Sequence, residues 1–166
     1  RNVEMDAFTE KRIKMSNLEE CIIKAHEDGL VDHIAVRVGK GEQILNDCFY
    51  SADYEINSKT LFDMASVTKI MVTTMLTLIA ADRKLLNFDD KVNRFFPCPN
   101  DKSELTIKHL LTHTMGYGHR SLCEKGNTYD NIQNYVLSLP CDFPVGTKVD
   151  YSCPGFILLG KILEKV

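Results

Sequence analysis

Hydrophobic and polar positions follow two different periodicities over the first part of the chain. From about 10 to 28 the apolar side chains recur every three or four residues, which predicts an amphipathic helix that ends at Gly29. The stretches 33–39 and 43–50 are rich in β-branched and aromatic residues, and the turn-forming letters "GKGE" connect them. The beginning of the chain therefore predicts one helix followed by a two-stranded hairpin.

Helical spacing dominates the remainder of the chain. Capping residues and a Pro/Gly loop, "CDFPVGTKVD", separate the apolar repeats from one another. The expected helices run from Ser66 to about Arg83, from a Thr106 cap to near Gly116, across 132–139 and across 156–163.

The first of these helices contains the segment Ile70–Ala81, which carries no charge and lies between Lys69 and Asp82. A bilayer-spanning helix needs roughly 20 apolar residues, so this shorter segment is not a membrane span. It predicts instead a central helix that is buried in a protein core.

The combination of elements indicates a mixed α/β (α+β) fold that is incomplete. A two-stranded hairpin is marginal by itself and needs further strands beside it, and the last helix runs to Val166 without a cap. We expect residues 1–166 to be one incomplete domain cut from a longer chain. Residues 1–62 would supply a helix and hairpin, and residues 63–166 a mostly helical region.

Composition limits the kinds of partner and compartment. The net charge of −3 gives no reason to expect nucleic acid or an anionic membrane as a partner. The six cysteines include no C-x-x-C spacing, so a disulfide framework or a zinc site is not expected. Free cysteines of this kind favour a reduced, cytoplasmic compartment, and an exported form stays open as the alternative.

The stretch "LFDMASVTKI" places a hydroxyl and an ammonium at the entrance of the apolar helix. Ser66 and Lys69 are three residues apart and share one helix face, and the helix dipole favours an anion at this end. We expect the apolar surroundings to desolvate Lys69 and lower its pKa, which would allow it to take a proton from Ser66. The alternative is that Ser66 caps the helix while Lys69 extends toward solvent.

Four sequence blocks in register give this pair a wider context. They are "TLFDMASVTK", "LLNFDDKVNRFFP", "LTIKHLLTHTMGYG" and "FPVGTKVDYSCPGFILLGKILEKV". From about residue 15 to the C-terminus the chain resembles the serine β-lactamase and penicillin-binding-protein superfamily, in its class C β-lactamase-like, esterase and D-alanyl-D-alanine carboxypeptidase branch. The resemblance implies the N-terminal portion of a β-lactamase-like fold and a serine hydrolase that needs no metal or organic cofactor.

The same resemblance assigns roles to three side chains. Ser66 would be the acylated nucleophile, Lys69 its proton-handling partner, and Tyr151 the group that acts as base and later as acid. A nearby ammonium would stabilise the phenolate form of Tyr151. The substrate would be a small molecule or peptide with a transferable acyl group, such as a β-lactam, a D-Ala peptide or an ester. The alternative for Tyr151 is an aromatic residue packed in the core at a helix start.

Cys153 is a departure from the family pattern, which is Tyr-x-Asn. A thiol is a poorer donor and acceptor than the amide it replaces at this substrate-binding position, so weak or absent β-lactam turnover is expected. Cys153 as an alternative nucleophile lacks an evident base. A literal Tyr-x-Asn at Tyr129–Asn131 lacks the flanking residues of the family block and is interpreted as a coincidence.

Two histidines four residues apart have the spacing of a metal-binding pair. Leu110 stands where a metalloprotease would have glutamate, and no third ligand is evident, so His109 and His113 are interpreted as structural. Their segment resembles the family block "LLTHTSG", with Met115 in place of the serine.

The third family motif, Lys or His followed by Thr or Ser and then Gly on a strand, is absent from the chain. "SKTL", "HTMG" and "VGTK" are near matches in letters but not in position. The missing strand would supply an oxyanion-hole amide, and losing one such donor typically costs about two to three powers of ten in rate. We therefore expect the chain to need a C-terminal half for competence. A non-catalytic scaffold or an acylated sensor is the alternative to an enzyme.

Overall fold

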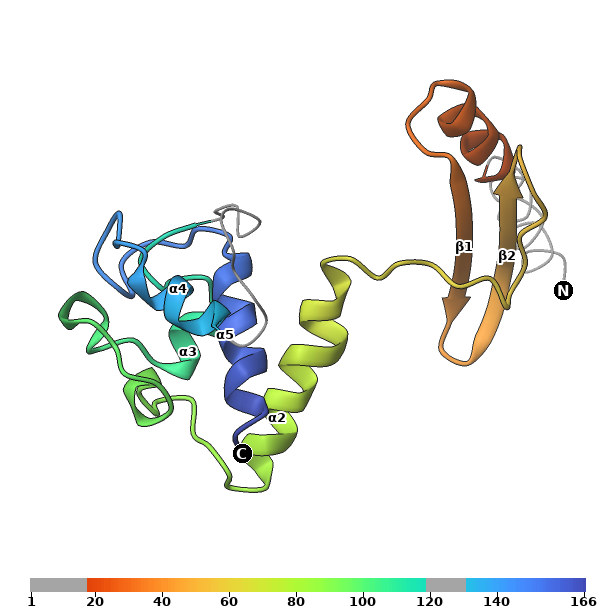
Figure 1. Ribbon diagram of the computed structural model, residues 1–166. Coiled ribbons are helices and arrows are strands. Elements are labelled where there is room, and N and C mark those ends of the chain that lie inside the picture. Colours follow the sequence, from red (N-terminus) through yellow and green to blue (C-terminus); the bar gives the residue numbers. More distant parts are fainter. Residues whose placement is uncertain (1–17, 119–130) are drawn as a thin grey trace, which may run out of the picture. The chain divides into compact units, whose positions relative to one another are not determined.

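The structure is a computed structural model that describes residues 18–118 and 131–166 (Figure 1). The chain divides into two compact units, residues 1–63 and residues 64–166, and each is described by itself. The first unit combines a helix with a hairpin and the second is helical, so the mixed α and β content expected from the sequence is confirmed.

The first unit contains a helix over 18–27 and an antiparallel hairpin of β1 (His33–Lys40) and β2 (Gln43–Ser51). The helix ends at residue 27, and the turn after it contains Gly29, whose φ of +68° is a conformation that glycine adopts without strain. The predicted helix end and the predicted hairpin are thus confirmed. The expected beginning of the helix, near residue 10, lies outside the described residues.

The second unit is built from short helices connected by loops and 3-10 turns. Its first helix begins with the π-helical turn η1 and continues as α2, which the sequence predicts as one helix. The elements are η1 (Lys69–Thr74), α2 (Met75–Asp82), η2 (Val92–Arg94), η3 (Asn100–Lys102), α3 (Ile107–Leu111), α4 (Ile132–Ser138) and α5 (Cys153–Leu163).

Helix α3 is shorter than expected. The predicted Thr106 cap is confirmed, because its hydroxyl accepts a hydrogen bond from the His109 N–H. The predicted end near Gly116 is wrong, since α3 ends at Leu111. His113 has a left-handed φ of +56°, which a continuing right-handed helix cannot accommodate.

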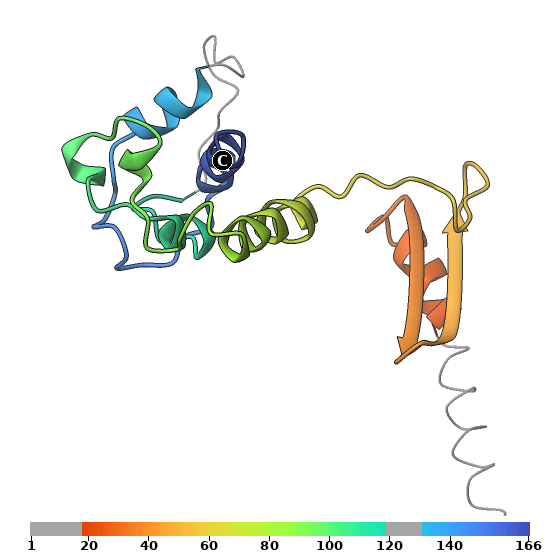
Figure 2. The same ribbon diagram turned by 90° about the horizontal axis from the view of Figure 1, so that it is seen from below.

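Helix α5 is the centre of the second unit. It contacts η1, α2, α3 and α4, as can be followed in Figures 1 and 2. The fully buried apolar residues around it form one cluster. Members with no exposed surface include Val92, Leu105, Ile107, Leu110, Met115, Tyr117, Val136, Leu158, Leu159 and Ile162.

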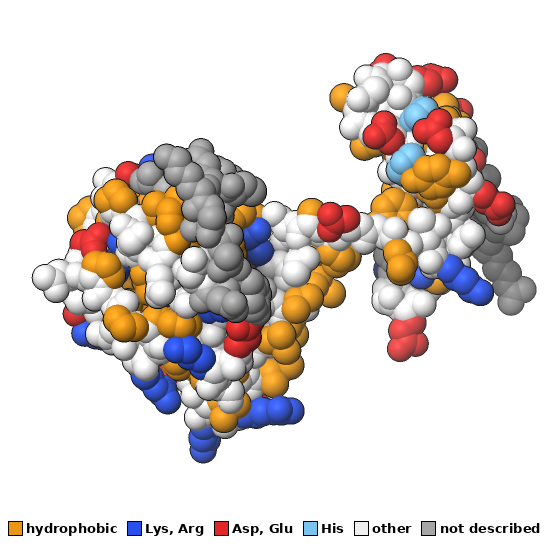
Figure 3. Space-filling view, in the orientation of Figure 1, with side chains coloured by type: hydrophobic (Ala, Val, Ile, Leu, Met, Phe, Trp, Pro, Cys, Tyr) orange, Lys and Arg blue, Asp and Glu red, His pale blue; other side chains and the backbone are white. Residues whose placement is uncertain are grey.

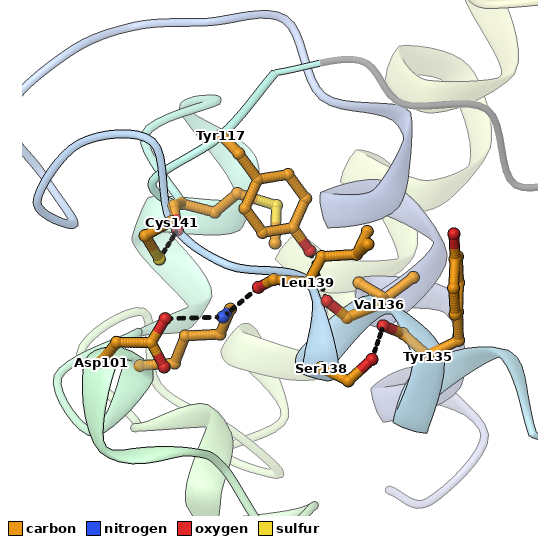
Figure 4. A network of polar contacts seen from close by, with 9 residues as sticks. Asp101, Tyr117, Tyr135, Val136, Ser138, Leu139 and Cys141 are labelled. Atoms are coloured by element: carbon orange, nitrogen blue, oxygen red, sulfur yellow. Dashed lines mark hydrogen bonds and ion pairs between the residues drawn. The ribbon is translucent and has the colours of Figure 1, made fainter.

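A buried lysine connects the 3-10 turn η3 to the end of α4 through its bonds to Asp101 and Leu139, which are labelled in Figure 4. Lys102 is 1% exposed, and its Nζ donates to Asp101 Oδ2 at 3.0 Å and to the Leu139 carbonyl oxygen at 2.5 Å. The Tyr117 hydroxyl donates to the Val136 carbonyl oxygen at 2.5 Å. These bonds satisfy polar groups that water cannot reach, and they fix the start of the loop that leads to α5.

The expectation of a buried central helix is wrong within the second unit. Ile70 is 65% exposed and Met71 is 60% exposed, whereas Thr77 and Ala80 are the buried residues of α2. Orange side chains follow this helix in Figure 3. One side of the helix packs on α5, and no described element of the unit covers the opposite side. Among the described residues no helix is long and apolar enough to cross a membrane.

Candidate active site

Ser66 lies immediately before the first helical residue of the second unit. Ala65 precedes it with a φ of +41°, an uncommon conformation for a residue with a Cβ. The Lys69 N–H then donates to the Ser66 carbonyl oxygen at 3.1 Å, which closes the first turn. Ser66 is exposed, so its hydroxyl is open to a substrate at the positive end of the helix.

Two predicted side chains, Lys69 and Tyr151, converge on the Ser66 hydroxyl oxygen. Lys69 Nζ donates to Ser66 Oγ at 3.2 Å, as the spacing of the two residues predicts. The Tyr151 hydroxyl donates to the same oxygen at 2.7 Å, although the two residues are 85 positions apart. Lys69 Nζ also lies 5.1 Å from the centroid of the Tyr151 ring. The arrangement is a hydroxyl held between an ammonium and a phenol.

The pKa of Lys69 is raised, whereas the sequence predicts that it is lowered. Partial burial acts to lower its pKa, but hydrogen bonds and electrostatic attraction involving Tyr151 and Cys153 outweigh burial and raise the pKa. The prediction of a lysine made basic by desolvation is therefore wrong. The physical reason is that Lys69 is only half-buried and that the Tyr151 phenol and the Cys153 thiol lie beside it. Lys69 is held as an ammonium.

Tyr151 is positioned by the start of α5. It is 45% exposed, which does not fit an aromatic residue packed in a core. The next residue, Ser152, is fully buried and caps α5, since its Oγ accepts from the Gly155 N–H at 3.3 Å. Ser152 Oγ also lies 3.0 Å from Met115 Sδ. The exposed phenol of Tyr151 is therefore attached to the backbone directly before a buried helix cap.

The segment 113–118 supports the loop that carries Tyr151. The Asp142 N–H donates to the Gly116 carbonyl oxygen at 2.8 Å, and the Gly146 N–H donates to the Thr114 carbonyl oxygen at 2.8 Å. Gly116 has a φ of +107°, and a Cβ there would lie 2.6 Å from Cys141 Sγ. The close approach of these two backbone segments requires glycine at this position.

Cys153, the departure from the family pattern, is the first residue of α5. It is half-buried and its thiol is free. Its side chain is near enough to Lys69 to contribute to the raised pKa of that lysine. The thiol thus reaches the lysine, but it cannot supply the N–H donors that an amide would offer to a substrate.

The two histidines have separate partners. His109 Nδ1 accepts from the Thr106 N–H at 3.2 Å and completes the cap of α3. His113 Nδ1 accepts from the Ser152 N–H at 3.0 Å. Each Nδ1 therefore already accepts a hydrogen bond from a backbone N–H. Across the described ranges, no group of three His, Cys, Asp or Glu side chains could hold a metal ion.

His113 is the residue of this site that the sequence interpretation missed. Its ring centroid lies 4.8 Å from that of Tyr151 and 5.1 Å from that of Phe156. No spacing rule connects residues 38 positions apart, so a local pattern holds no signal for this contact. The literal Tyr-x-Asn match at Tyr129 lies outside the described residues.

Comparison with known proteins identifies a matching family model and relatives of the chain. A family model described as "Beta-lactamase" matches residues 22–166. The N-acetylmuramyl-L-alanine amidase of Bacillus subtilis (strain 168) is 27% identical over 192 aligned residues, covering 99% of this chain and 43% of the amidase. Esterase EstB of Burkholderia gladioli is 38% identical, covering 84% of this chain and 42% of the esterase.

Solved structures give the same fold. A class C β-lactamase from Rhodobacter sphaeroides superposes with a TM-score of 0.73 at 23% identity, covering 90% of this chain and 43% of that one. The chain therefore has the fold of the N-terminal portion of these proteins. It spans less than half the length of the relatives that it matches.

Proposed function

The chain belongs to the β-lactamase family of serine hydrolases, and we propose that Ser66 is its nucleophile in an acyl-transfer reaction. The observation that carries the proposal is the double hydrogen bonding of Ser66 Oγ, to Tyr151 at 2.7 Å and to Lys69 at 3.2 Å. A nucleophile and its proton acceptor need to be within about 2.6–3.2 Å, and the Tyr151 pair meets this condition.

The raised pKa of Lys69 indicates which residue acts as the base. An ammonium cannot accept a proton, so Tyr151 is the proposed base. Once Tyr151 has released to solvent the hydroxyl proton that it donates to Ser66 in the structure, its oxygen lies 2.7 Å from Ser66 Oγ and takes the proton of Ser66, with the Lys69 charge beside it. Ser66 Oγ then forms a bond to the acyl carbon. The bond from that carbon to the leaving group breaks, and the Tyr151 hydroxyl returns the proton to the departing oxygen or nitrogen.

Hydrolysis of the acyl-enzyme uses the same groups in reverse. The Tyr151 phenolate takes a proton from water, and the resulting hydroxide attacks the acyl carbon. The bond from Ser66 Oγ to that carbon then breaks, and Tyr151 returns the proton to Ser66 Oγ. The negative charge on the carbonyl oxygen is favoured at this end of the helix, next to the backbone N–H of Ser66.

The substrate class follows from the relatives and from Cys153. The amidase and the esterase are named for amide and ester cleavage, and an acyl group on either leaving atom fits the proposed steps. The thiol at position 153 disfavours rapid β-lactam turnover because it offers the substrate no amide donor. This thiol favours one second candidate, a sensor that is acylated on Ser66 and releases the acyl group slowly.

Labelling with a fluorophosphonate, followed by intact mass spectrometry, tests the nucleophile. We expect one adduct on the wild-type protein and none on Ser66→Ala. Ser138→Ala is the matched control, because Ser138 is an exposed serine whose Oγ donates to the Tyr135 carbonyl oxygen at 2.8 Å, outside the site. Labelling that persists in Ser66→Ala, or that is absent from the wild type, would contradict the proposal.

A time course with a β-lactam separates the hydrolase from the sensor. In a hydrolase the added mass on Ser66 appears and is lost as the acyl-enzyme turns over. In a sensor the added mass persists after free β-lactam is removed.

A further inference from the structure

We propose that His113 is the positioning residue for Tyr151, holding the phenol at its hydrogen-bonding distance from Ser66. The inference rests on the proposed function, in which Tyr151 moves the proton. It concerns a histidine that the sequence comparison with the family block would leave as a purely structural residue.

Two hydrogen bonds that His113 accepts come from the residues on either side of Tyr151 in the chain. The Asp150 N–H donates to the His113 carbonyl oxygen at 2.8 Å, and the Ser152 N–H donates to His113 Nδ1 at 3.0 Å. One residue thus anchors the backbone N–H of the residue before the tyrosine and that of the residue after it. Backbone rotation at Tyr151 is restricted from both sides, which fixes the direction in which its side chain leaves the backbone.

The ring of His113 adds a third contact. It contacts the rings of both Tyr151 and Phe156, with centroid distances of 4.8 Å and 5.1 Å. Phe156 is buried in α5, so the histidine connects the half-exposed phenol to the core. The left-handed φ of +56° at His113 turns both its carbonyl oxygen and its ring toward the 150–152 segment, after α3 has ended.

The hydrogen bond to Nδ1 requires a neutral imidazole, because a protonated ring has no acceptor nitrogen. The charges near the ring act in the same direction. Burial, and then the charge of Lys69 from η1, lower the pKa of His113 and outweigh the backbone interaction with Ser152, which acts to raise it. Two other ionisable groups lie near the ring. One is the Tyr151 phenol, which the ring contacts. The other is the Asp150 carboxylate, which lies against Gly118 and pairs with Lys148 at 3.5 Å.

Acidification should therefore release Tyr151. Protonated His113 could no longer accept the hydrogen bond from the Ser152 N–H, and its positive charge would repel that of Lys69. The rate of Ser66 acylation should fall as the pH drops through the lowered pKa of His113. A histidine that only filled space would give no such dependence.

A pair of substitutions isolates the acceptor on the side chain. Both asparagine and glycine tolerate a left-handed backbone, so neither His113→Asn nor His113→Gly forces position 113 out of its conformation. Asparagine offers an oxygen at the place of Nδ1, and glycine offers none. His109→Asn is the matched control, because His109 is equally half-buried, accepts a backbone N–H through Nδ1 and also has a lowered pKa.

The measurement is the rate of fluorophosphonate labelling of Ser66 between pH 5 and 8. We expect His113→Gly to label about 10- to 100-fold more slowly than His113→Asn, because small misplacements of a reacting group cost rates of that order. The loss of rate at acid pH should be less steep in His113→Asn than in the wild type, and as steep in His109→Asn as in the wild type. Equal rates in the Asn and Gly variants, or an unchanged acid profile, would overturn the proposal.

A second readout is independent of activity. NMR of ¹³C-labelled tyrosine, with Tyr151→Phe to assign the signal, should show the Tyr151 ring resonance shifted in His113→Gly and unchanged in His109→Asn. If wild-type Ser66 is never labelled, the proposed function fails, and this spectrum still tests the positioning. An unshifted Tyr151 signal in His113→Gly would overturn the positioning role even if Ser66 is labelled normally.

Discussion

Ser152→Ala should destabilise the second unit by removing the cap of its central helix. Ser152 Oγ accepts from the Gly155 N–H at 3.3 Å and lies 3.0 Å from Met115 Sδ. Alanine removes the acceptor and leaves the Gly155 N–H without it. Ser152 and Gly155 are both buried, so water does not replace the lost partner.

The magnitude follows from that burial. Replacing a serine N-cap by alanine costs about 0.5–2 kcal/mol, and a buried donor left without a partner costs about 1–3 kcal/mol. These ranges describe the same lost bond, so they overlap and do not add. We expect a loss of about 1–2 kcal/mol in the free energy of unfolding, because α5 contacts α2, α3 and α4 and cannot fray without loosening the core.

The assay is urea unfolding followed by far-ultraviolet circular dichroism. The midpoint should fall while the slope m stays constant, since the surface exposed on unfolding is unchanged. Ser138→Ala is the control, because Ser138 is exposed and its loss should cost less than about 0.5 kcal/mol. If Ser152→Ala lowers the midpoint no more than Ser138→Ala does, the capping argument is refuted.

Cys153→Asn should accelerate acylation of Ser66 by a chromogenic cephalosporin, measured by stopped-flow absorbance. One added hydrogen bond of about 0.5–1.5 kcal/mol corresponds to about a 2- to 10-fold gain, and an unchanged rate would locate the deficit elsewhere. Acid should weaken the fold through His109 and His113, whose pKa values burial lowers below the usual 6.5. The stability from keeping them neutral is complete above about pH 6.5 and is lost as the pH falls through the lowered values. Urea midpoints measured from pH 7.5 to 5 should decline less in a His109→Asn/His113→Asn double variant, and an equal decline would contradict the assignment.

Elements set by local chemistry were predictable from the sequence. The hairpin follows from two β-rich stretches around a turn, and the Gly29 helix end follows from the freedom of glycine at positive φ. The approach of Lys69 to Ser66 is a property of any helix, because residues three apart share a face. Each of these predictions depends on residues that are close in the chain.

Predictions about environment failed where they needed the neighbours in space. The apolar segment Ile70–Ala81 predicts burial, but burial depends on which elements cover a helix, and in the second unit α5 covers one side. The pKa of Lys69 was expected to fall from desolvation. It rises, because Tyr151 and Cys153 lie beside the ammonium and outweigh the effect of burial.

The sequence by itself determined the hairpin, the helix over 67–82 and the serine–lysine pair at its entrance. The resemblance to a family added Tyr151, which no local pattern would connect with Ser66. Tertiary structure alone decided that Lys69 stays charged and that His113 lies against Tyr151. The physical reason is that both outcomes depend on contacts between residues 38 to 85 positions apart, which form only when the 113–118 segment, the 139–152 loop and α5 pack together.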